Sequence, residues 1–240
     1  MNSIEVSESQ GVRYLHFGSH LVQGAMRIAR PSSLELEYTR EMMLPLLLHP
    51  GSAWPRSVLQ IGLGSASLTR FLLRHRPKAQ LTVVEIAPQV IAAARQFFKL
   101  PEESPGLRIE VGDGHDYVAS TNRRFDLILV DGFDAAGRAG MLETVPFYVN
   151  CASRLRSAGM MAANLLTRHR GVDPIVARIR EAFADHVLVL PTCDKGNTIA
   201  LAANGRDMDL SPEEWRNAAR RLKVETALDL SPTLRRLFGG

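Results

Sequence analysis

The sequence predicts an α/β protein with a mostly parallel, seven-stranded sheet that is covered by helices on both faces and preceded by a small amino-terminal β hairpin or sheet. Short apolar segments with strand character alternate with segments of helical spacing along most of the 240 residues. This alternation is typical of parallel sheets built from strand, helix and strand units. Four consecutive predicted strands also end in glycines or in a carboxylate, and open α/β sheets bind their ligands at that edge.

The chain begins with a short β region. Residues 4 to 30 alternate in the manner of short antiparallel strands, and Pro31 ends the pattern. From Leu34 to Leu48 the apolar spacing predicts one helix. Ser33 is suited to cap it, and acidic residues such as Glu35 in its first turn favour the helix dipole.

The segment from Ser57 to Glu85 is central to the prediction. Val58 to Ile61 form an apolar run that suits a buried parallel strand, and a glycine-containing turn, residues 62 to 67, follows at once. Glycine allows a sharp turn and a close approach of a ligand to the backbone. After a helical segment and a second apolar strand comes Glu85, about twenty residues beyond the glycines, where nucleoside-binding units place the carboxylate for the ribose hydroxyls. The glycines alone would indicate only a tight turn.

Strands and helices continue to alternate after Glu85. Strands are predicted at 107–111, 125–130, 159–166, 186–190 and 198–203, and helices at 88–98, 115–119, 142–155 and 172–183. An acid-capped helix from Ser211 and a last segment at 228–238 follow. We therefore expect three parts: a small β region (1–33), a nucleoside-binding catalytic domain (34–205) and a helical appendage (206–240).

Composition excludes several functional classes. The net charge is only +4, without a long run of one sign, so a nucleic-acid partner is not expected. The two cysteines, Cys151 and Cys193, lie far apart without metal-ligand spacing, and no metal is expected. The chain shows neither a secretory signal nor an apolar run of transmembrane length. A cytoplasmic protein that does not contact a membrane is the expectation.

Acidic residues follow the predicted strands in succession: Glu85 after the second, Asp113 after the third, and Asp131 with Asp134 after the fourth. Each could alone be a helix cap or a turn residue. Their joint occurrence at one edge of the sheet favours a ligand site.

The sequence resembles the spermidine synthase (polyamine aminopropyltransferase) family, a branch of the Rossmann-like class I methyltransferase fold. The resemblance covers roughly residues 12 to 203 and rests on the segments VLQIGLGSAS, VVEIAPQVIAAAR, IEVGDGHDYV and FDLILVDGFDAAG, together with a strand ending at Gln23 and a helix start at Tyr38 to Met42. It implies transfer of an aminopropyl group from decarboxylated S-adenosylmethionine to an amine such as putrescine, in a homodimer.

The resemblance also implies roles for individual residues. Asp131 would be the base that deprotonates the attacking amine; a placed carboxylate can do this. The amine would be bound by Asp134, Tyr38 and Tyr148. The nucleoside would be bound by Gln23, Gly62, Gly64, Ser65, Glu85, Asp113 and Gly114. For Tyr148, which lies on an apolar helix face, packing in the core is an alternative.

Two departures from the family pattern keep other functions open. Ser65 stands where the family has an aspartate that holds the aminopropyl ammonium, and the loop after Asp134 lacks the family's prolines and contains Arg138. Loss of that anion could admit intact S-adenosylmethionine. The alternatives are therefore a methyltransferase on the same fold and a noncatalytic nucleoside-binding relative.

Overall fold

A seven-stranded sheet in the order β6-β5-β4-β7-β8-β10-β9 forms the centre of the molecule. The computed structural model describes residues 4–18, 22–49, 51, 53–134, 136–166, 171–193, 196–205 and 208–239. The strands are β4 (Ser57–Ile61), β5 (Gln80–Glu85), β6 (Leu107–Val111), β7 (Phe125–Val130), β8 (Leu155–Leu166), β9 (Val187–Val189) and β10 (Asn197–Ala203). The five neighbouring strands β6, β5, β4, β7 and β8 pair in parallel, whereas β10 is antiparallel to both β8 and β9. The predicted fold class is confirmed.

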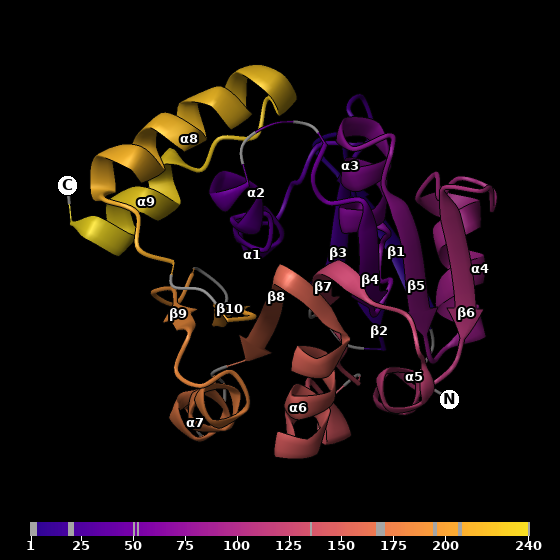
Figure 1. The fold of residues 1–240 in the computed structure, drawn as a ribbon. Helices are drawn as coiled ribbons and strands as arrows, with labels where there is room; N and C mark the ends of the chain where they lie inside the picture. Colours follow the sequence, from indigo (N-terminus) through magenta and orange to yellow (C-terminus); the bar gives the residue numbers. More distant parts are fainter. Residues whose placement is uncertain are drawn as a thin grey trace.

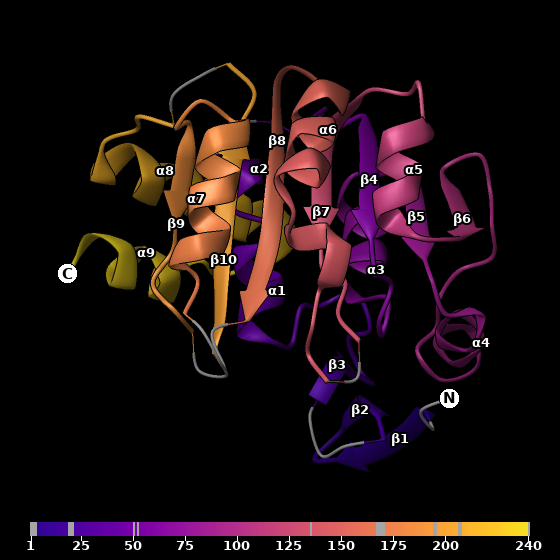
Figure 2. The same cartoon turned by 90° about the horizontal axis from the view of Figure 1, so that it is seen from below.

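Helices cover both faces of this sheet (Figures 1 and 2). One face packs against α5 (Gly114–Ser120), α6 (Val145–Arg154) and α7 (Asp173–Ala182), and the other against α2 (Pro45–Leu48), α3 (Ser67–His75), α4 (Pro88–Phe97), α8 (Pro212–Thr226) and α9 (Ser231–Phe238). Successive side chains of a strand point to opposite faces of the sheet, so Val58 and Leu59 of β4 pack in the two different helix layers. Both neighbours of β4, namely β5 and β7, run parallel to it. The chain continues from β4 to β5 and β6 on one side and then to β7 and β8 on the other side of β4. The strand order therefore reverses at β4, and ligands of open α/β sheets bind at the carboxyl ends of the strands at such a point.

A separate three-stranded antiparallel sheet precedes the central one and consists of β1 (Ile4–Ser9), β2 (Val12–Phe17) and β3 (Val22–Arg27). Strand β3 packs directly on the glycine turn. A Cβ atom added to Gly24 would lie 2.4 Å from Oγ of Ser65, and Oγ of Ser67 donates a hydrogen bond to the carbonyl of Ala25 over 2.8 Å. The small sheet thus supports one wall of the region above β4.

The single helix predicted from Leu34 to Leu48 is wrong. The structure has two short helices instead, α1 (Glu37–Glu41) and α2, and Ser33 caps neither of them. Pro45 has no N–H group to donate to the carbonyl of Glu41, so a continuous α-helix cannot pass through it. The N–H of Leu44 donates to that carbonyl instead, and the chain turns before α2 begins.

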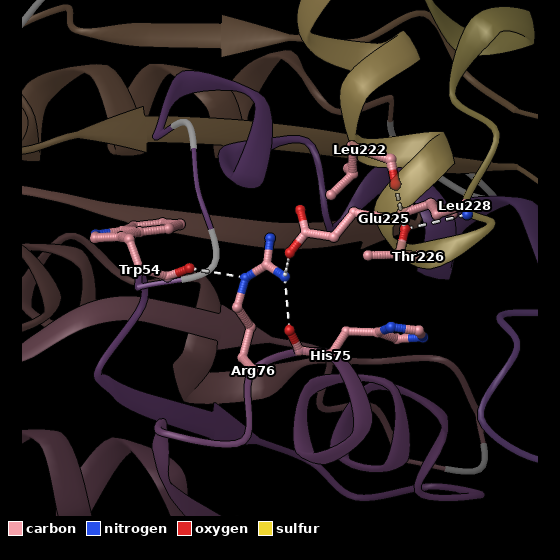
Figure 3. A network of polar contacts seen from close by, with 7 residues as sticks. All are labelled: Trp54, His75, Arg76, Leu222, Glu225, Thr226 and Leu228. Carbon is pink, nitrogen blue, oxygen red and sulfur yellow. Dashed lines mark hydrogen bonds and ion pairs between the residues drawn. The ribbon is translucent and has the colours of Figure 1, made fainter.

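A buried arginine directly after α3 connects α8 to the rest of the described chain (Figure 3). Arg76, whose side chain is 1% exposed, pairs with Glu225 of α8 at 2.9 Å. Its guanidinium also donates to the carbonyls of Trp54 (2.8 Å) and His75 (2.7 Å). Ser211 and Glu214 form the predicted cap of α8, as a complete capping box. Within the described ranges, none of the helices is long and apolar enough to cross a membrane.

Candidate active site

A cavity of about 1170 Å³ opens at the carboxyl ends of β4, β5, β6 and β7. It brings together nine of the eleven predicted site residues. These are Gln23, Tyr38, Gly62, Gly64, Glu85, Asp113, Gly114, Asp131 and Asp134. The cavity therefore lies where the strand ends and their acids predicted a ligand site.

The glycine turn and Glu85 line the cavity beside each other. Oε2 of Glu85 accepts a hydrogen bond from the backbone N–H of Leu63 over 2.8 Å, and Oε1 accepts one from that of Ala87 over 2.9 Å. Burial raises the pKa of Glu85, and these backbone donors act against that rise. Gly62 has a φ of +85°, and a Cβ atom there would lie 2.1 Å from the carbonyl oxygen of Asp131. Only glycine permits this contact between the turn and the end of β7.

Asp113 and Gly114 lie at the next strand end. Asp113 caps α5 by accepting a hydrogen bond from the backbone N–H of His115 over 2.7 Å, so its helix-cap role and its position in the cavity coexist. A Cβ atom on Gly114 would lie 2.3 Å from Cγ2 of Ile61. Asp113, His115 and Asp116 also offer ligand atoms within 4.8 Å of one another. Exposed acidic groups of this kind are common, and we assign no metal to them.

Asp131 lines the same cavity and lies directly after β7. Its Oδ1 accepts a hydrogen bond from Nδ2 of Asn164 over 2.9 Å, and its Oδ2 accepts a longer one, 3.3 Å, from the hydroxyl of Tyr38. Burial raises the pKa of Asp131, while these two donors lower it and the negative charge of Glu85 raises it further. A carboxylate held by neutral donors and raised in pKa by burial is suited to take up a proton.

Asp134 lines the cavity but is already engaged by its own loop. Its Oδ2 accepts from Nε of Arg138 over 2.9 Å, and its Oδ1 accepts from the backbone N–H groups of Ala136 and Arg138, each over 2.9 Å. Its slight burial acts to raise its pKa, but these donors and the positive charge of Arg138 outweigh that effect and lower the pKa. An amine that binds Asp134 must therefore compete with Arg138.

The other two predicted residues do not line the cavity. Ser65 is 3% exposed; its hydroxyl lies 2.9 Å from that of Ser67, and its carbonyl accepts from the buried Arg70. Tyr148 is 1% exposed and packs with Phe147 in the core beneath α6. The alternative of core packing therefore describes Tyr148, because its helix buries its apolar face against the sheet.

The sequence reasoning missed several polar residues of the cavity, of which Asn164 is the clearest. It lies 5% exposed near the end of β8, and its Oδ1 has no hydrogen-bond partner among the described residues. An asparagine within the otherwise apolar run of residues 160–166 was a usable signal, since buried amides need partners. The other missed cavity-lining polar residues are Glu35, Glu37, Arg40 and Asn197.

The partners of the cavity-lining carboxylates distinguish Asp131 from the others. Glu35, Glu37 and Asp134 each pair with an arginine, namely Arg27, Arg236 and Arg138. Glu85 and Asp113 accept from backbone N–H groups. Within the described part of the chain, Asp131 is the cavity-lining carboxylate that is held by two neutral side chains.

Comparisons with known proteins match most of the chain to one family. Residues 35–198 match the family described as "Spermine/spermidine synthase domain". The polyamine aminopropyltransferase of Chromobacterium violaceum is 35% identical over 237 residues, which are 99% of this chain and 90% of that protein.

Solved structures share the fold. A probable spermidine synthase from Corynebacterium glutamicum has a TM-score of 0.78 at 22% identity, over 92% of this chain and 83% of that one. Human methyltransferase-like protein 13 in complex with SAH has a TM-score of 0.71 at 23% identity, over 80% of this chain and 93% of that one. Aminopropyltransferases and methyltransferases thus have this fold in common, and the fold alone does not choose between the two reactions.

Proposed function

The chain belongs to the spermine/spermidine synthase family, and on that premise we propose that it transfers an aminopropyl group from decarboxylated S-adenosylmethionine to a polyamine such as putrescine. The observation that carries this proposal is the environment of Asp131, a half-buried carboxylate that has no cationic partner among the described residues and shares a cavity with the glycine turn and Glu85. A reaction that joins an amine to a nucleoside sulfonium needs a base and a nucleoside site side by side.

In this reaction the amine must first lose a proton, because an ammonium has no lone pair. Asp131 accepts that proton. The nitrogen then attacks the methylene carbon next to the sulfonium, forming a C–N bond. The C–S bond breaks, its electron pair goes to sulfur, and methylthioadenosine leaves as a neutral thioether. The product nitrogen is then a secondary ammonium, and Asp131 releases the proton that it took up to the solvent.

The remaining site residues divide between two ligands in this proposal. Glu85 accepts from the ribose hydroxyls, Asp113 with Gly114 contacts the adenine edge, and Gly62 with Gly64 allows the nucleoside to approach the backbone. Gln23 contacts the nucleoside as well. Tyr38 and Asp134 lie on the amine side with Asp131.

Ser65 stands where the resemblance implies an aspartate that holds the aminopropyl ammonium of the donor. Ser65 is turned away from the cavity toward β3, so it offers no direct contact to an aminopropyl ammonium. We propose the decarboxylated donor because the chain belongs to a family whose resemblance implies aminopropyl transfer. A homodimer, a cytoplasmic location and the lack of a metal requirement remain proposals that rest on the sequence.

Product analysis tests the function. The purified protein is incubated with decarboxylated or intact S-adenosylmethionine, each with putrescine or spermidine, and methylthioadenosine and the extended polyamine are quantified by mass spectrometry. We expect methylthioadenosine to form with the decarboxylated donor only when an amine is present. Transfer of a methyl group from the intact donor would establish a methyltransferase instead. Calorimetric binding of donors without any turnover would indicate a noncatalytic relative.

A further inference from the structure

The carboxyl-terminal helix α9 contacts the wall of the cavity through Arg236. One guanidinium nitrogen of this residue contacts Oε1 of Glu37, and another contacts Oε1 of Glu41. Thr233, one turn earlier on α9, donates from its hydroxyl to the same oxygen of Glu41 over 3.2 Å. Both glutamates belong to α1, which lies near the opposite end of the sequence but beside the carboxyl-terminal pair of helices (Figure 1).

Helix α1 leads directly to the proposed base. Glu37 lines the cavity, and the next residue, Tyr38, donates to Asp131. The helix has only five residues and lacks a side-chain cap at its start. A helix of one turn has little stability of its own. Its position, and with it the position of the Tyr38 hydroxyl, must be set by contacts with other elements.

Arg236 provides a strong contact of this kind. Glu41 is fully buried, and a buried carboxylate needs a cation or several donors to remain in place. The arginine side chain is 31% exposed and the Glu37 side chain 22% exposed, so both ion pairs are partly shielded from water. One planar cation with several N–H donors can hold two carboxylates of the same helix at once.

We propose that Arg236 is a positioning residue for the amine side of the active site: it fixes α1 so that Tyr38 reaches Asp131. This inference rests on the proposed aminopropyl transfer for its kinetic readout. It predicts that the carboxyl-terminal helix, which contributes no residue to the cavity lining among those described, nevertheless controls turnover.

The test compares Arg236→Gln and Arg236→Lys with Glu225→Gln. The last variant breaks the other anchor of the carboxyl-terminal helices, the ion pair with Arg76, outside the cavity. We expect Arg236→Gln to lower kcat roughly ten-fold, the cost of one or two misplaced hydrogen bonds, with little change in the KM of the nucleoside donor. Arg236→Lys keeps one charge and should restore part of the loss. Glu225→Gln should keep the kcat of the unmodified protein.

A double-mutant cycle makes the inference specific. If Arg236 acts through Tyr38, then Tyr38→Phe and Arg236→Gln should each reduce kcat, and their combination should cost little more than either alone. Additive losses, or a kcat for Arg236→Gln equal to that of Glu225→Gln, would overturn the proposal.

Hydrogen–deuterium exchange provides a readout that does not need turnover. In the peptide that covers residues 37–42, exchange should rise in Arg236→Gln and stay unchanged in Glu225→Gln. Absence of turnover in the unmodified protein would contradict the proposed function alone, whereas unchanged exchange in Arg236→Gln would contradict the positioning role alone.

Discussion

Asn164 donates a hydrogen bond from Nδ2 to Oδ1 of Asp131 over 2.9 Å, so the amide at the end of one strand orients the carboxylate that follows its neighbour. The second oxygen of Asp131 accepts from Tyr38. With both oxygens held, the carboxylate has a defined orientation toward the cavity. This arrangement is the basis of the first two predictions.

Replacement of Asp131 by Asn should abolish transfer while leaving the nucleoside site intact. Asparagine has almost the same shape but cannot take up the proton of the amine. General bases typically contribute 10²- to 10⁴-fold, so we expect kcat to fall by at least about 10²-fold. Calorimetry with methylthioadenosine should give an affinity close to that of the unmodified protein. Undiminished turnover would remove Asp131 from the role of base.

Replacement of Asn164 by Ala should shift the pH dependence of transfer. The hydrogen bond from Asn164 lowers the pKa of Asp131, against the rise caused by burial and by Glu85. Without that bond the pKa rises further. Because the base acts only when ionised, the acidic limb of the pH profile of kcat should move to higher pH, and activity should approach that of the unmodified protein at high pH. A profile lowered equally at every pH would indicate a purely structural effect.

The fold could be predicted because the patterns that determine it lie within short segments of the sequence. Alternating apolar segments, turn residues and acids at strand ends define the sheet and its functional edge. Seven of the nine predicted residues around the cavity lie at that edge, whereas Gln23 and Tyr38 were predicted from the family resemblance. The family resemblance added the roles. Tyr148 shows the limit of this reasoning, since helical spacing indicates a buried face without indicating whether that face meets the core or a cavity.

The contacts that set the electrostatics of the site could not be predicted. Arg236 and Glu41 lie 195 residues apart in sequence, and no local pattern links them. The pairing of Asp134 with Arg138 depends on how one loop turns. Asn164 could have been identified as a polar residue in an apolar strand. Its contact with Asp131, however, depends on β7 and β8 being neighbours in the sheet.

Removal of the Arg138 side chain should improve binding of the amine. Arg138 pairs with Asp134 at 2.8 Å, but its side chain is 76% exposed and that of Asp134 is 43% exposed. Such exposed pairs are weak, worth about 0.2–1 kcal/mol. Arg138→Ala should therefore lower the KM for the amine by a factor of roughly two to five, more so at low ionic strength. If the KM is unchanged or rises, Asp134 does not bind the amine in competition with Arg138.

Glu41 should make the stability of the protein depend on pH. Burial raises its pKa from 4.5 to about 7, although Arg236 and Thr233 act against the rise. Between these values the folded protein binds a proton that the unfolded chain does not. The contribution of Glu41 to the free energy of unfolding is therefore full at low pH, and it is lost as the pH rises through about 7.

Urea unfolding at pH 5 and pH 8 checks this prediction. The unmodified protein should lose more free energy of unfolding between the two pH values than Glu41→Gln does, by at most about 3 kcal/mol. Glu225→Gln serves as a control, since it removes a different carboxylate that pairs a carboxyl-terminal helix with the rest of the chain. Equal pH dependence in the unmodified protein and Glu41→Gln would show that Glu41 stays ionised throughout.

Replacement of Gly62 by Ala should disrupt both the fold and the site. A Cβ atom there would lie 2.1 Å from the carbonyl oxygen of Asp131, on a backbone with a φ of +85°. Relief of this overlap must move β4 and β7 apart, because both partners are backbone. We expect the free energy of unfolding to fall by about 2 kcal/mol or more, with loss of nucleoside binding. Gly106→Ala is the matched control, since its nearest neighbour would lie at 3.7 Å and its stability should change little. Equal stability of the two variants would show that the turn does not require glycine at position 62.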